Sequence, residues 1–502
     1  MESLAGTSWD VVIEGTGLQQ SLLALALSRS DKKVLHVDGN NYYGGPEAAF
    51  SLQEAEVWAE SLKATPSAPF SNVSWQKPDT SASSAKKLSP SRAYTLTLSP
   101  QIIYAKSKLV SQLVSSQVYR QLEFQAVGNW WLYENTVGAS PDAREAGTLK
   151  RMPNGREDIF SDRSIDVRAK RGLMKFIKFV VDFENQPDVW ETHADTPFVE
   201  FLASQFQMPL SMQTYLVALT LSLEPPAVTS VRYALPRIAR HLTSIGVFGP
   251  GFGAVVPKWG GGAEIAQVAC RAGAVGGAVY VLGTGISGAD TGATEVNLKL
   301  TNDEAVQARH YVSSQDKASC KINSDAPTVS KMVAVVSSDL SSLFVATVEG
   351  SPVAAVAVVA FPAGSVAADG ESSQHPIFIM VHSSDSGECP QGQYVLYAST
   401  TNIQNPKGRL EAAVSKLLKS AEPGTVLFEM YYEQSRSSTS NLASDTSCAL
   451  PSSSLDLSFD DSTLDGVEDA WRRIMGSPET ESPYMVFETR EQLGDDDDNG
   501  MD

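Results

Sequence analysis

A glycine-rich turn near the N-terminus has the residue types and spacing of a nucleotide-binding site. An apolar run at residues 11–13 leads into Gly15-Thr16-Gly17, and an apolar stretch continues through Leu27, which predicts a strand, a tight turn and a helix. A second apolar run at residues 34–37 ends in Asp38, 23 residues after Gly15, close to the ~20 expected for an acid that binds a ribose. These residues are typical of a dinucleotide-binding βαβ unit.

The third glycine of that fingerprint is replaced by Gln20. This glycine normally lets the helix approach the strand, and the helix N-terminus then receives the pyrophosphate. A glutamine side chain here either holds the helix away or fills the phosphate site. Two interpretations follow from the residues alone: a βαβ unit that serves only as a scaffold, or a flavin or nicotinamide site. We expect the scaffold, and therefore no bound FAD or NAD.

Composition excludes several classes of protein. A chain of 502 residues predicts two or three domains, and it has neither an apolar run long enough to span a bilayer nor the features of a signal peptide, so we expect a soluble, cytosolic protein. Its four cysteines are far apart, which predicts reduced thiols and no structural metal. The net charge of −19 argues against nucleic acid as a partner.

The order of segments favours a mixed fold. Residues 51–90 are rich in Ser, Pro and Lys, which predicts a long surface excursion, and a helix is expected from about residue 100. The region 166–245 shows apolar residues at helical spacing. Beyond it, β-branched and aromatic runs predict strands of a mixed sheet at residues 331–336, 353–361, 377–381, 394–398 and 426–432. A helix near residues 467–475 precedes an acidic end, "GDDDDNGMD".

The sequence offers no convincing catalytic constellation. Its six histidines are scattered, and no acid and base stand in an arrangement that suggests proton transfer. We therefore expect no catalytic residues and no metal ligands.

Four longer segments identify a family. They are "WDVVIEGTGLQQSLLALALSRSDKKVLHVDGNNYYGG", "SRAYTLTLSPQIIYAKSKLVSQLVSSQVYRQLEF", "RMPNGREDIFSDRSIDVRAKRGLMKFIKFV" and "PKWGGGAEIAQVACRAGAVGG". Together they resemble the superfamily of Rab escort proteins and Rab GDP-dissociation inhibitors. The resemblance implies an α/β (α+β mixed) fold with a large flavin-oxidase-like domain I and a smaller all-helical domain II. Domain I would comprise residues 1–120, with 51–90 as a polar insertion, and 236–476; domain II would comprise 121–235, and 477–502 would form an acidic tail.

The resemblance also implies a Rab-binding platform. In the family it is built by the "YYGG" region and the segment after "GGG", and the matching acid and base stand seven residues apart here if Ala263 is an insertion. A proline usually precedes the platform glutamine, whereas this chain has Ala266. On the residues alone, the tyrosines could equally pack a turn, and the acid and base could be an ordinary surface pair on a helix. The predicted Rab-binding residues are Tyr42, Tyr43, Gly44, Gly45, Arg92, Glu264, Gln267 and Arg271.

Within the superfamily the escort branch is the closer resemblance, because the polar segments and the acidic tail enlarge the chain. It implies a non-catalytic accessory component of a protein geranylgeranyltransferase. Such a component binds a GDP-bound, unprenylated Rab GTPase, presents it to the transferase α/β heterodimer, shelters the geranylgeranyl lipid and delivers the product to a membrane. Phe198 and Phe201 share one helical face, and we expect them to be exposed aromatics that bind the transferase, with core packing as the alternative.

Three other functions are retained as alternatives to the escort function. A Rab GDP-dissociation inhibitor is the nearest of them. An FAD-dependent oxidoreductase and a general lipid-binding protein without a GTPase partner are the more distant ones.

Overall fold

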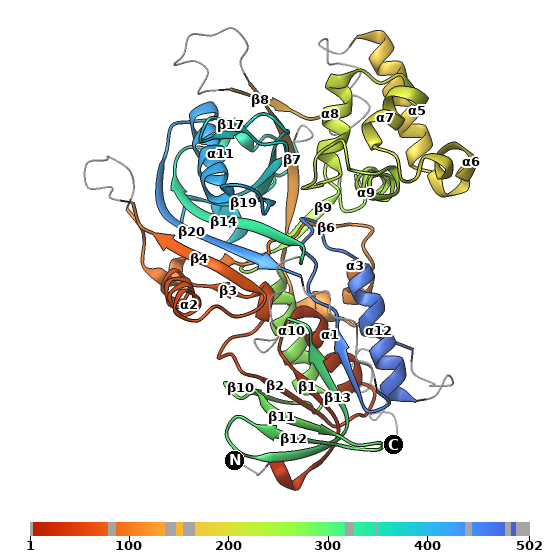
Figure 1. The fold of residues 1–502 in the computed structure, drawn as a ribbon, viewed down its shortest axis with the longest axis vertical. Coiled ribbons are helices and arrows are strands. Elements are labelled where there is room, and N and C mark those ends of the chain that lie inside the picture. The colour runs from red at the N-terminus through yellow and green to blue at the C-terminus, as the bar shows by residue number, and fades with distance from the viewer. Residues whose placement is uncertain are drawn as a thin grey trace, which may run out of the picture.

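The computed structural model describes residues 4–78, 87–135, 147–153, 166–316, 326–346, 350–436, 444–476 and 483–487. They form two large sheets and a layer of helices (Figure 1). In that view the smaller of the two sheets lies at the bottom, the larger sheet lies above it, and helices α5 to α9 lie beside the larger sheet.

The smaller sheet carries the N-terminal βαβ unit. Strand β1 lies between β2 and β13 and is parallel to both. It is buried on both faces, as its continuous apolar run requires. Helices α1 (Leu18–Ser28), α3 (Lys108–Ser115), α10 (Gly262–Val275) and α12 (Ser462–Met475) share one apolar cluster with this sheet. Its seven strands are β10 (Val279–Leu282), β2 (Val34–Asp38), β1 (Ser8–Glu14), β13 (Ala305–Ser314), β12 (Val296–Leu300) and β11 (Ile286–Thr291), in that order, with β21 (Ser447–Leu450) beside β13.

The larger sheet has ten strands and is mixed. Helix α11 (Pro406–Ser420) packs on it, and α2 (Leu52–Ala64) lies beside its edge strand β4. The strand order is β4 (Phe70–Gln76), β20 (Thr425–Ser435), β14 (Thr328–Ser337), β19 (Tyr394–Thr401), β18 (Ile377–His382), β15 (Val356–Phe361), β7 (Phe124–Glu134), β9 (Ala254–Pro257) and β6 (Ile103–Tyr104), with β8 (Thr148–Arg151) beside β7. Two small ribbons pair β3 (Ala49–Phe50) with β5 (Leu96–Thr97) and β16 (Ala367–Ala368) with β17 (Glu371–Ser372).

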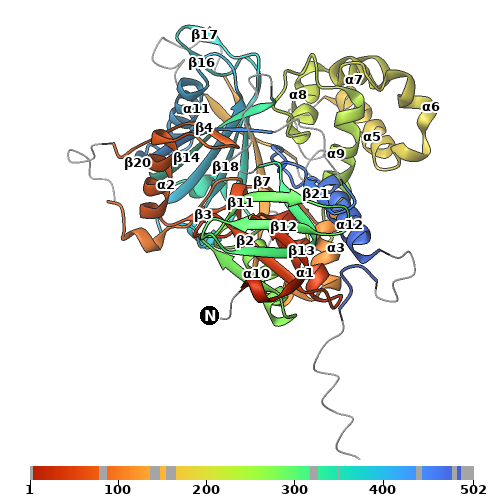
Figure 2. The same ribbon diagram turned by 60° about the horizontal axis from the view of Figure 1, so that its bottom comes forward.

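The helical layer is built on aromatic packing. It consists of α5 (Val167–Val180), α6 (Pro187–Trp190), α7 (Phe198–Phe206), α8 (Leu210–Leu219) and α9 (Val231–Ser244). Five phenylalanines meet between α5 and α7: Phe176, Phe179, Phe198, Phe201 and Phe206. They belong to an apolar cluster that continues into β7 and β15 of the larger sheet, so the layer is fixed to the sheet. Figure 2 shows the same layer beside the larger sheet from a second direction.

The mixed fold with a βαβ opening is confirmed. Four of the five β-type runs beyond residue 330 lie wholly in strands, namely β14, β18, β19 and β20, and the run expected at 353–361 forms β15 only from Val356 onward. The helix expected from residue 100 begins later, at Lys108, because residues 103–104 pair with β9 and the side chain of Ser107 caps the helix by accepting from Leu109 N–H. No helix in the described ranges is long and apolar enough to cross a bilayer.

Two boundary expectations differ from the structure. Most of the stretch 51–90 is not an excursion, because α2 and β4 fill it; a capping box of Ser51 and Glu54 starts α2. Residues 79–86 of that stretch lie outside the described residues. Strands β7 and β8 belong to the larger sheet, whereas we expected helical structure from residue 121. The division into domains I and II itself stays a prediction, and of the acidic tail only residues 483–487 are described.

Candidate functional site

The "YYGG" turn is fastened between the first βα turn and helix α10. Gly44 N–H donates to the carbonyl oxygen of Thr16, at 3.1 Å. Gly44 has φ +96°, and a Cβ on it would lie 3.1 Å from Cβ of Ala263 in α10. Gly45 also has a positive φ, +48°. Both the backbone conformation and the close approach to α10 therefore favour glycine at position 44.

Helix α10 presents a polar face beside this turn. Glu264, Gln267 and Arg271 are spaced three and four residues apart, so they share one side of the helix. Glu264 and Gln267 are half-buried and Arg271 is exposed. The opposite side packs Ile265 and Val268 into the core beneath the smaller sheet. The structure therefore brings together three of the predicted residues on one accessible surface.

The two tyrosines of the turn have different environments. Tyr42 packs edge-to-face on Phe50, with ring centroids 4.9 Å apart, and its hydroxyl is hydrogen-bonded to Trp58. Burial raises the pKa of Tyr42 to about 12. Tyr43 instead lies near Arg271 and Cys270 of α10, close enough for their charges to act on it. Tyr43 thus joins the polar face of α10, whereas Tyr42 supports the turn from inside.

The charged side chains on this face are Glu264 and Arg271. Partial burial raises the pKa of Glu264, and the nearby Arg271 opposes that shift. Burial also raises the pKa of Tyr43, so its hydroxyl stays protonated and can donate a hydrogen bond. Arg271 forms no ion pair within 4 Å of any described residue. An exposed guanidinium without an internal partner is available to an acidic group on another molecule.

Arg92 lies outside α10, on a separate segment of the chain. It is exposed, in a short 3₁₀ turn (Ser91–Ala93), and its guanidinium has no partner in the described part of the chain. The segment that follows is tied to the loop at residues 383–389, because Thr95 N–H donates to Glu388 O at 3.0 Å. The same loop accepts a hydrogen bond from Trp259 N–H, which just precedes α10.

The first βα turn does not fit a dinucleotide. At the start of α1, Leu18 N–H points at Glu47 Oε2, at 3.4 Å, so a carboxylate from the chain lies where a pyrophosphate would bind. Gln20 covers the turn as well, because a Cβ on Gly17 would lie only 2.7 Å from Gln20 Oε1. Burial raises the pKa of Glu47 to about 7, so this side chain excludes a phosphate chiefly by occupying its position. Of the two alternatives for Gln20, filling of the phosphate site is the one observed.

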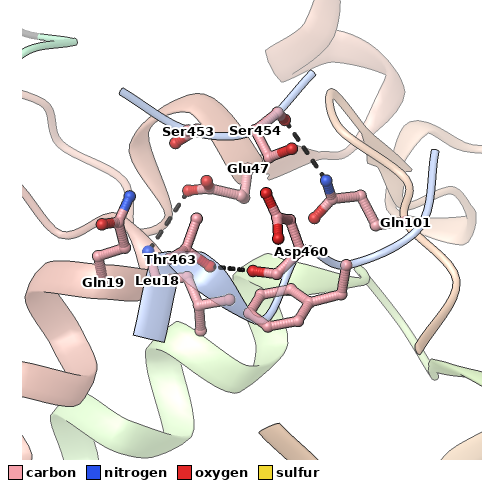
Figure 3. Close-up of a pocket in the computed structure, with 9 residues that line it drawn as sticks. Leu18, Gln19, Glu47, Gln101, Ser453, Ser454, Asp460 and Thr463 are labelled. Atoms are coloured by element: carbon pink, nitrogen blue, oxygen red, sulfur yellow. Dashed lines mark hydrogen bonds between the residues drawn. The ribbon is translucent and has the colours of Figure 1, made fainter. Parts of the chain in front are cut away.

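The remaining parts of the fingerprint are also used internally. Asp38 Oδ2 accepts from the backbone and side chain of Thr16, at 2.7 and 2.6 Å, and Oδ1 accepts from Asn40 N–H at 2.8 Å. These are the oxygens that a ribose would need. The cleft beside Glu47, drawn in Figure 3, has a cavity volume of about 10 Å³, roughly enough for one water molecule. That is below the ~300–1,000 Å³ of ordinary small-molecule sites.

Residues 5–481 match the protein family described as GDP dissociation inhibitor. The chain belongs to the GDP dissociation inhibitor family. It is 31% identical to a Saccharomyces cerevisiae protein named Rab proteins geranylgeranyltransferase component A, over 83% of this chain and 66% of that one. A Candida albicans protein of the same name is 31% identical over 81% of this chain and 62% of its own length. The chain thus spans slightly less than two thirds of both relatives.

Other relatives and solved structures extend the comparison. A guanosine nucleotide diphosphate dissociation inhibitor of Arabidopsis thaliana is 25% identical over 55% of this chain and 56% of that one. Among solved structures, a Rab GDI from Plasmodium falciparum superposes with a TM-score of 0.64 at 18% identity, over 94% of this chain and 98% of that one. An oxidoreductase from Methanosarcina mazei gives 0.58 at 11% identity, over 93% and 100%. At these identities the two structures share the fold alone.

In this member of the GDP dissociation inhibitor family, the two aromatics expected on the surface of the helical layer are buried. Phe198 is 0% and Phe201 1% exposed. Phe198 packs on Phe176, and Phe201 packs on Phe179, with centroid separations of 5.9 and 6.1 Å. The expectation of exposure was wrong, because the helical face that the two residues share is the one that α5 covers.

Sequence reasoning missed two residues near the site. Glu47 follows the "YYGG" turn by two positions, and nothing in its spacing distinguished it from a surface acid. Trp259 stands directly before the glycine triplet at 260–262 and is 44% exposed. An aromatic residue at the edge of a glycine-rich turn was a usable signal, because such turns commonly carry binding residues.

Proposed function

We propose that this protein is a Rab escort protein. It binds a GDP-bound, unprenylated Rab GTPase, presents it to the Rab geranylgeranyltransferase α/β heterodimer and carries the prenylated product to membranes. The observation that carries the proposal is the polar face of α10, where Glu264, Gln267 and Arg271 lie beside Tyr43 in a chain of the GDP dissociation inhibitor family. Gly44 and Gly45 shape the turn against this face, and Arg92 extends it.

The chemistry of the face suits a protein partner. A neutral tyrosine hydroxyl, an amide and a carboxylate supply donors and acceptors, and Arg271 supplies a charge that the described residues leave unpaired. Aromatic and arginine side chains provide a large share of the binding energy in many interfaces. The whole chain carries a net charge of −19. Arg92 and Arg271, which form no ion pair with a described residue, add positive charge to this surface, and positive charge favours an acidic patch on the GTPase.

Similarity favours an escort protein over an inhibitor. The two component A proteins align over 83% and 81% of the chain at 31% identity, whereas the Arabidopsis inhibitor aligns over 55% at 25%. An escort acts before prenylation, so it needs the transferase as a second partner. The transferase performs the alkylation, and the escort contributes no catalytic residue.

The escort must then keep the attached lipid out of water. Burying an isoprenoid chain is worth ~0.8 kcal/mol per methylene, so even partial cover holds the product in the cytosol. We assign this role to the helical layer, where the apolar side chains of Val181 and Leu210 are exposed. Release follows when a bilayer competes for the lipid, which makes membrane association transient.

A reconstituted prenylation reaction tests the proposal. A GDP-loaded Rab GTPase, the transferase heterodimer and geranylgeranyl diphosphate are mixed with and without this protein, and lipid transfer is measured by mass spectrometry. We expect transfer to require the protein and to fall with Arg271→Ala. Arg309→Ala is the matched control, because Arg309 is an exposed arginine of β13 that faces Asp10 rather than α10. Equal transfer in the absence of the protein would refute the escort function.

Two alternatives lead to different results. A Rab GDP-dissociation inhibitor would bind only the prenylated GTPase and would not support transfer. A flavin-dependent oxidoreductase would release stoichiometric FAD on denaturation. We expect no flavin absorbance in the purified protein, because Glu47 and Gln20 fill the phosphate position.

A further inference from the structure

Trp259 is held in a backbone conformation that disfavours its residue type. It lies between β9 and α10 with φ +63°, in the left-handed region, and Gly260 and Gly261 after it also have positive φ values, +150° and +59°. Glycine adopts this region freely, whereas a bulky aromatic residue does so only at a cost in free energy. Position 259 would therefore suit a glycine, as positions 260 and 261 do. A tryptophan here indicates that the side chain has a use that outweighs this cost in free energy.

The surroundings fix the indole in one orientation. The backbone N–H of Trp259 donates to the backbone carbonyl oxygen of Ser386 at 3.2 Å. A Cβ on Gly387 would lie 2.4 Å from both Cδ1 and Nε1 of the indole, so the ring lies directly on the glycine backbone. Behind it, Glu388 is buried and accepts a hydrogen bond from the hydroxyl of Tyr397, at 2.9 Å. The loop at 383–389 is therefore a rigid support, and the ring is preorganised.

The indole is nevertheless accessible. Trp259 is 44% exposed, and its Nε1–H has no acceptor among the residues that the structure describes. Lys258 Nζ lies 4.3 Å from the ring centroid and also pairs with Glu123, at 2.9 Å. An ordered aromatic ring with a free donor beside a cation is the kind of group that acts as an anchor in protein interfaces.

Trp259 lies next to the polar face of α10. The helix begins at Gly262 and Glu264 is in its first turn. On the other side, the loop at 383–389 joins Trp259 to the segment that carries Arg92, through the bonds from Trp259 N–H and Thr95 N–H to its carbonyl oxygens. Through this loop the indole is linked to the segment that carries Arg92, and α10 follows the indole directly in the chain.

We propose that Trp259 is an anchor residue for the GTPase that binds the α10 face. Its ring enters an apolar depression on the GTPase, and Lys258 meets an acidic group at the rim of that depression. The inference rests on the escort function proposed above, because its occupant is the same GTPase. Continuity with α10 and the cation of Lys258 beside the ring favour this occupant over a lipid or a second copy of the chain.

Affinity measurements with designed variants test the anchor. The dissociation constant for a GDP-loaded, unprenylated Rab GTPase is measured by calorimetry for the full chain, for Trp259→Gly and for Trp259→Phe. Val167→Ala is the control, because Val167 is 67% exposed on α5, outside the α10 face. We expect Trp259→Gly to weaken binding at least tenfold, Trp259→Phe to have a smaller effect because it loses only the N–H and part of the ring, and Val167→Ala to have none.

Thermal melting separates binding from folding. Glycine removes the unfavourable φ, so Trp259→Gly should melt at the temperature of the unchanged protein or above it. If Trp259→Gly binds within twofold of the unchanged protein, the anchor is refuted while the escort function stands. If the unchanged protein binds no GTPase, both proposals fail. If Trp259→Gly melts at a lower temperature, Trp259→Phe becomes the deciding variant. The anchor is also refuted if Trp259→Phe binds the GTPase as tightly as the unchanged protein does and shows the same fluorescence change on binding.

Discussion

Two adjacent tyrosines in the "YYGG" turn have different surroundings. Tyr43 lies beside Arg271, whereas Tyr42 packs on Phe50 and Trp58. We predict that Tyr43→Ala and Arg271→Ala each weaken GTPase binding by ~2 kcal/mol, about thirtyfold, with little change in melting temperature. Tyr42→Ala should do the opposite, lowering the melting temperature through loss of an aromatic contact. Calorimetric titration and thermal melts of the three variants measure both quantities.

The contrast between the two positions makes this prediction specific. Arg309→Ala controls for the loss of an exposed positive charge. A large loss of stability in Tyr43→Ala with normal affinity would mean that Tyr43 merely packs the turn.

At the scale of single residues, the sequence predicted that Glu264 and Arg271 lie on one surface. It did not predict that Glu47 lies at the start of α1, where a cofactor phosphate would bind. The spacing of Glu264 and Arg271 required a common helical face, since residues seven apart on a helix lie on one side. Gln20 signalled a defective fingerprint. The role of Glu47 depends on a tertiary contact with α1 across 29 residues, and no local pattern encodes such a contact. Trp259 was missed because its backbone conformation becomes apparent only in the folded turn.

Helix α7 supports the helical layer through Phe198 and Phe201. Both are buried against α5, so truncation leaves a cavity. We predict that Phe198→Ala or Phe201→Ala destabilises the protein by ~3–5 kcal/mol, measured by urea unfolding. Glu200→Ala is the control on the exposed side of α7 and should change stability by less than ~0.5 kcal/mol. A normal unfolding curve for both phenylalanine variants would contradict the packing seen here.

Helix α9 carries a buried histidine at its contact with the larger sheet. The ring of His241 packs edge-to-face on Trp130 and Tyr104, at 4.9 and 5.7 Å, and burial lowers its pKa from 6.5 to about 4. The folded state thus binds this proton less tightly than the unfolded state does. The contribution to stability is intact above pH 6.5 and is lost progressively as pH falls toward about 4.

A variant without the titrating group tests this. His241→Phe keeps the ring contacts, so its unfolding free energy should resemble that of the unchanged protein at pH 7.5. At pH 5, 1.5 units below the unfolded pKa, the unchanged protein should have lost about 2 kcal/mol more than the variant. Urea unfolding of both proteins at the two pH values gives the difference. An equal loss in both would show that His241 does not carry the acid sensitivity of this contact.

At the scale of elements, periodicity predicted the helices and strands more successfully than their boundaries. The apolar runs of β14 and β20 are long enough to be unambiguous. The segment 51–90 was misjudged because its polar composition hides α2, whose apolar residues occupy one side only, and β4, an edge strand that needs few apolar residues. Strand β7 lies before the helical layer in sequence but pairs with β15 in space, and single-sequence patterns do not reveal such pairings.

The whole molecule shares its fold with an oxidoreductase, and we propose that it uses this scaffold for protein recognition. The smaller sheet still brings the first βα turn, the "YYGG" turn and α10 to one place, as a nucleotide fold does. Glu47 occupies the position of the pyrophosphate and Thr16 that of the ribose. The side of α10 that is not needed for the core then remains available to a partner. We therefore propose that the same packing of α1 and α10 both fills the cofactor position and leaves one side of α10 for a partner.

An escort protein and an inhibitor differ in the complexes that they form. An escort must hold a GTPase on α10 and a transferase elsewhere at the same time, so the two surfaces must not overlap. With Phe198 and Phe201 buried, the candidate for the second surface is Leu210, the exposed first residue of α8 on the helical layer. We predict that the protein, an unprenylated GTPase and the transferase form a three-component complex with a Kd of about 1 µM or lower, near −8 kcal/mol.

Two variants separate the surfaces in that complex. Leu210→Asp should remove the transferase while GTPase binding persists, because a charge cannot enter an apolar pocket without a large desolvation cost. Tyr43→Ala should instead weaken the GTPase contact. Analytical ultracentrifugation distinguishes the binary and ternary species. If the unchanged protein binds prenylated GTPase but never the transferase at micromolar concentrations, it is a GDP-dissociation inhibitor; if it binds the transferase and Leu210→Asp does so equally well, the transferase uses another part of the surface.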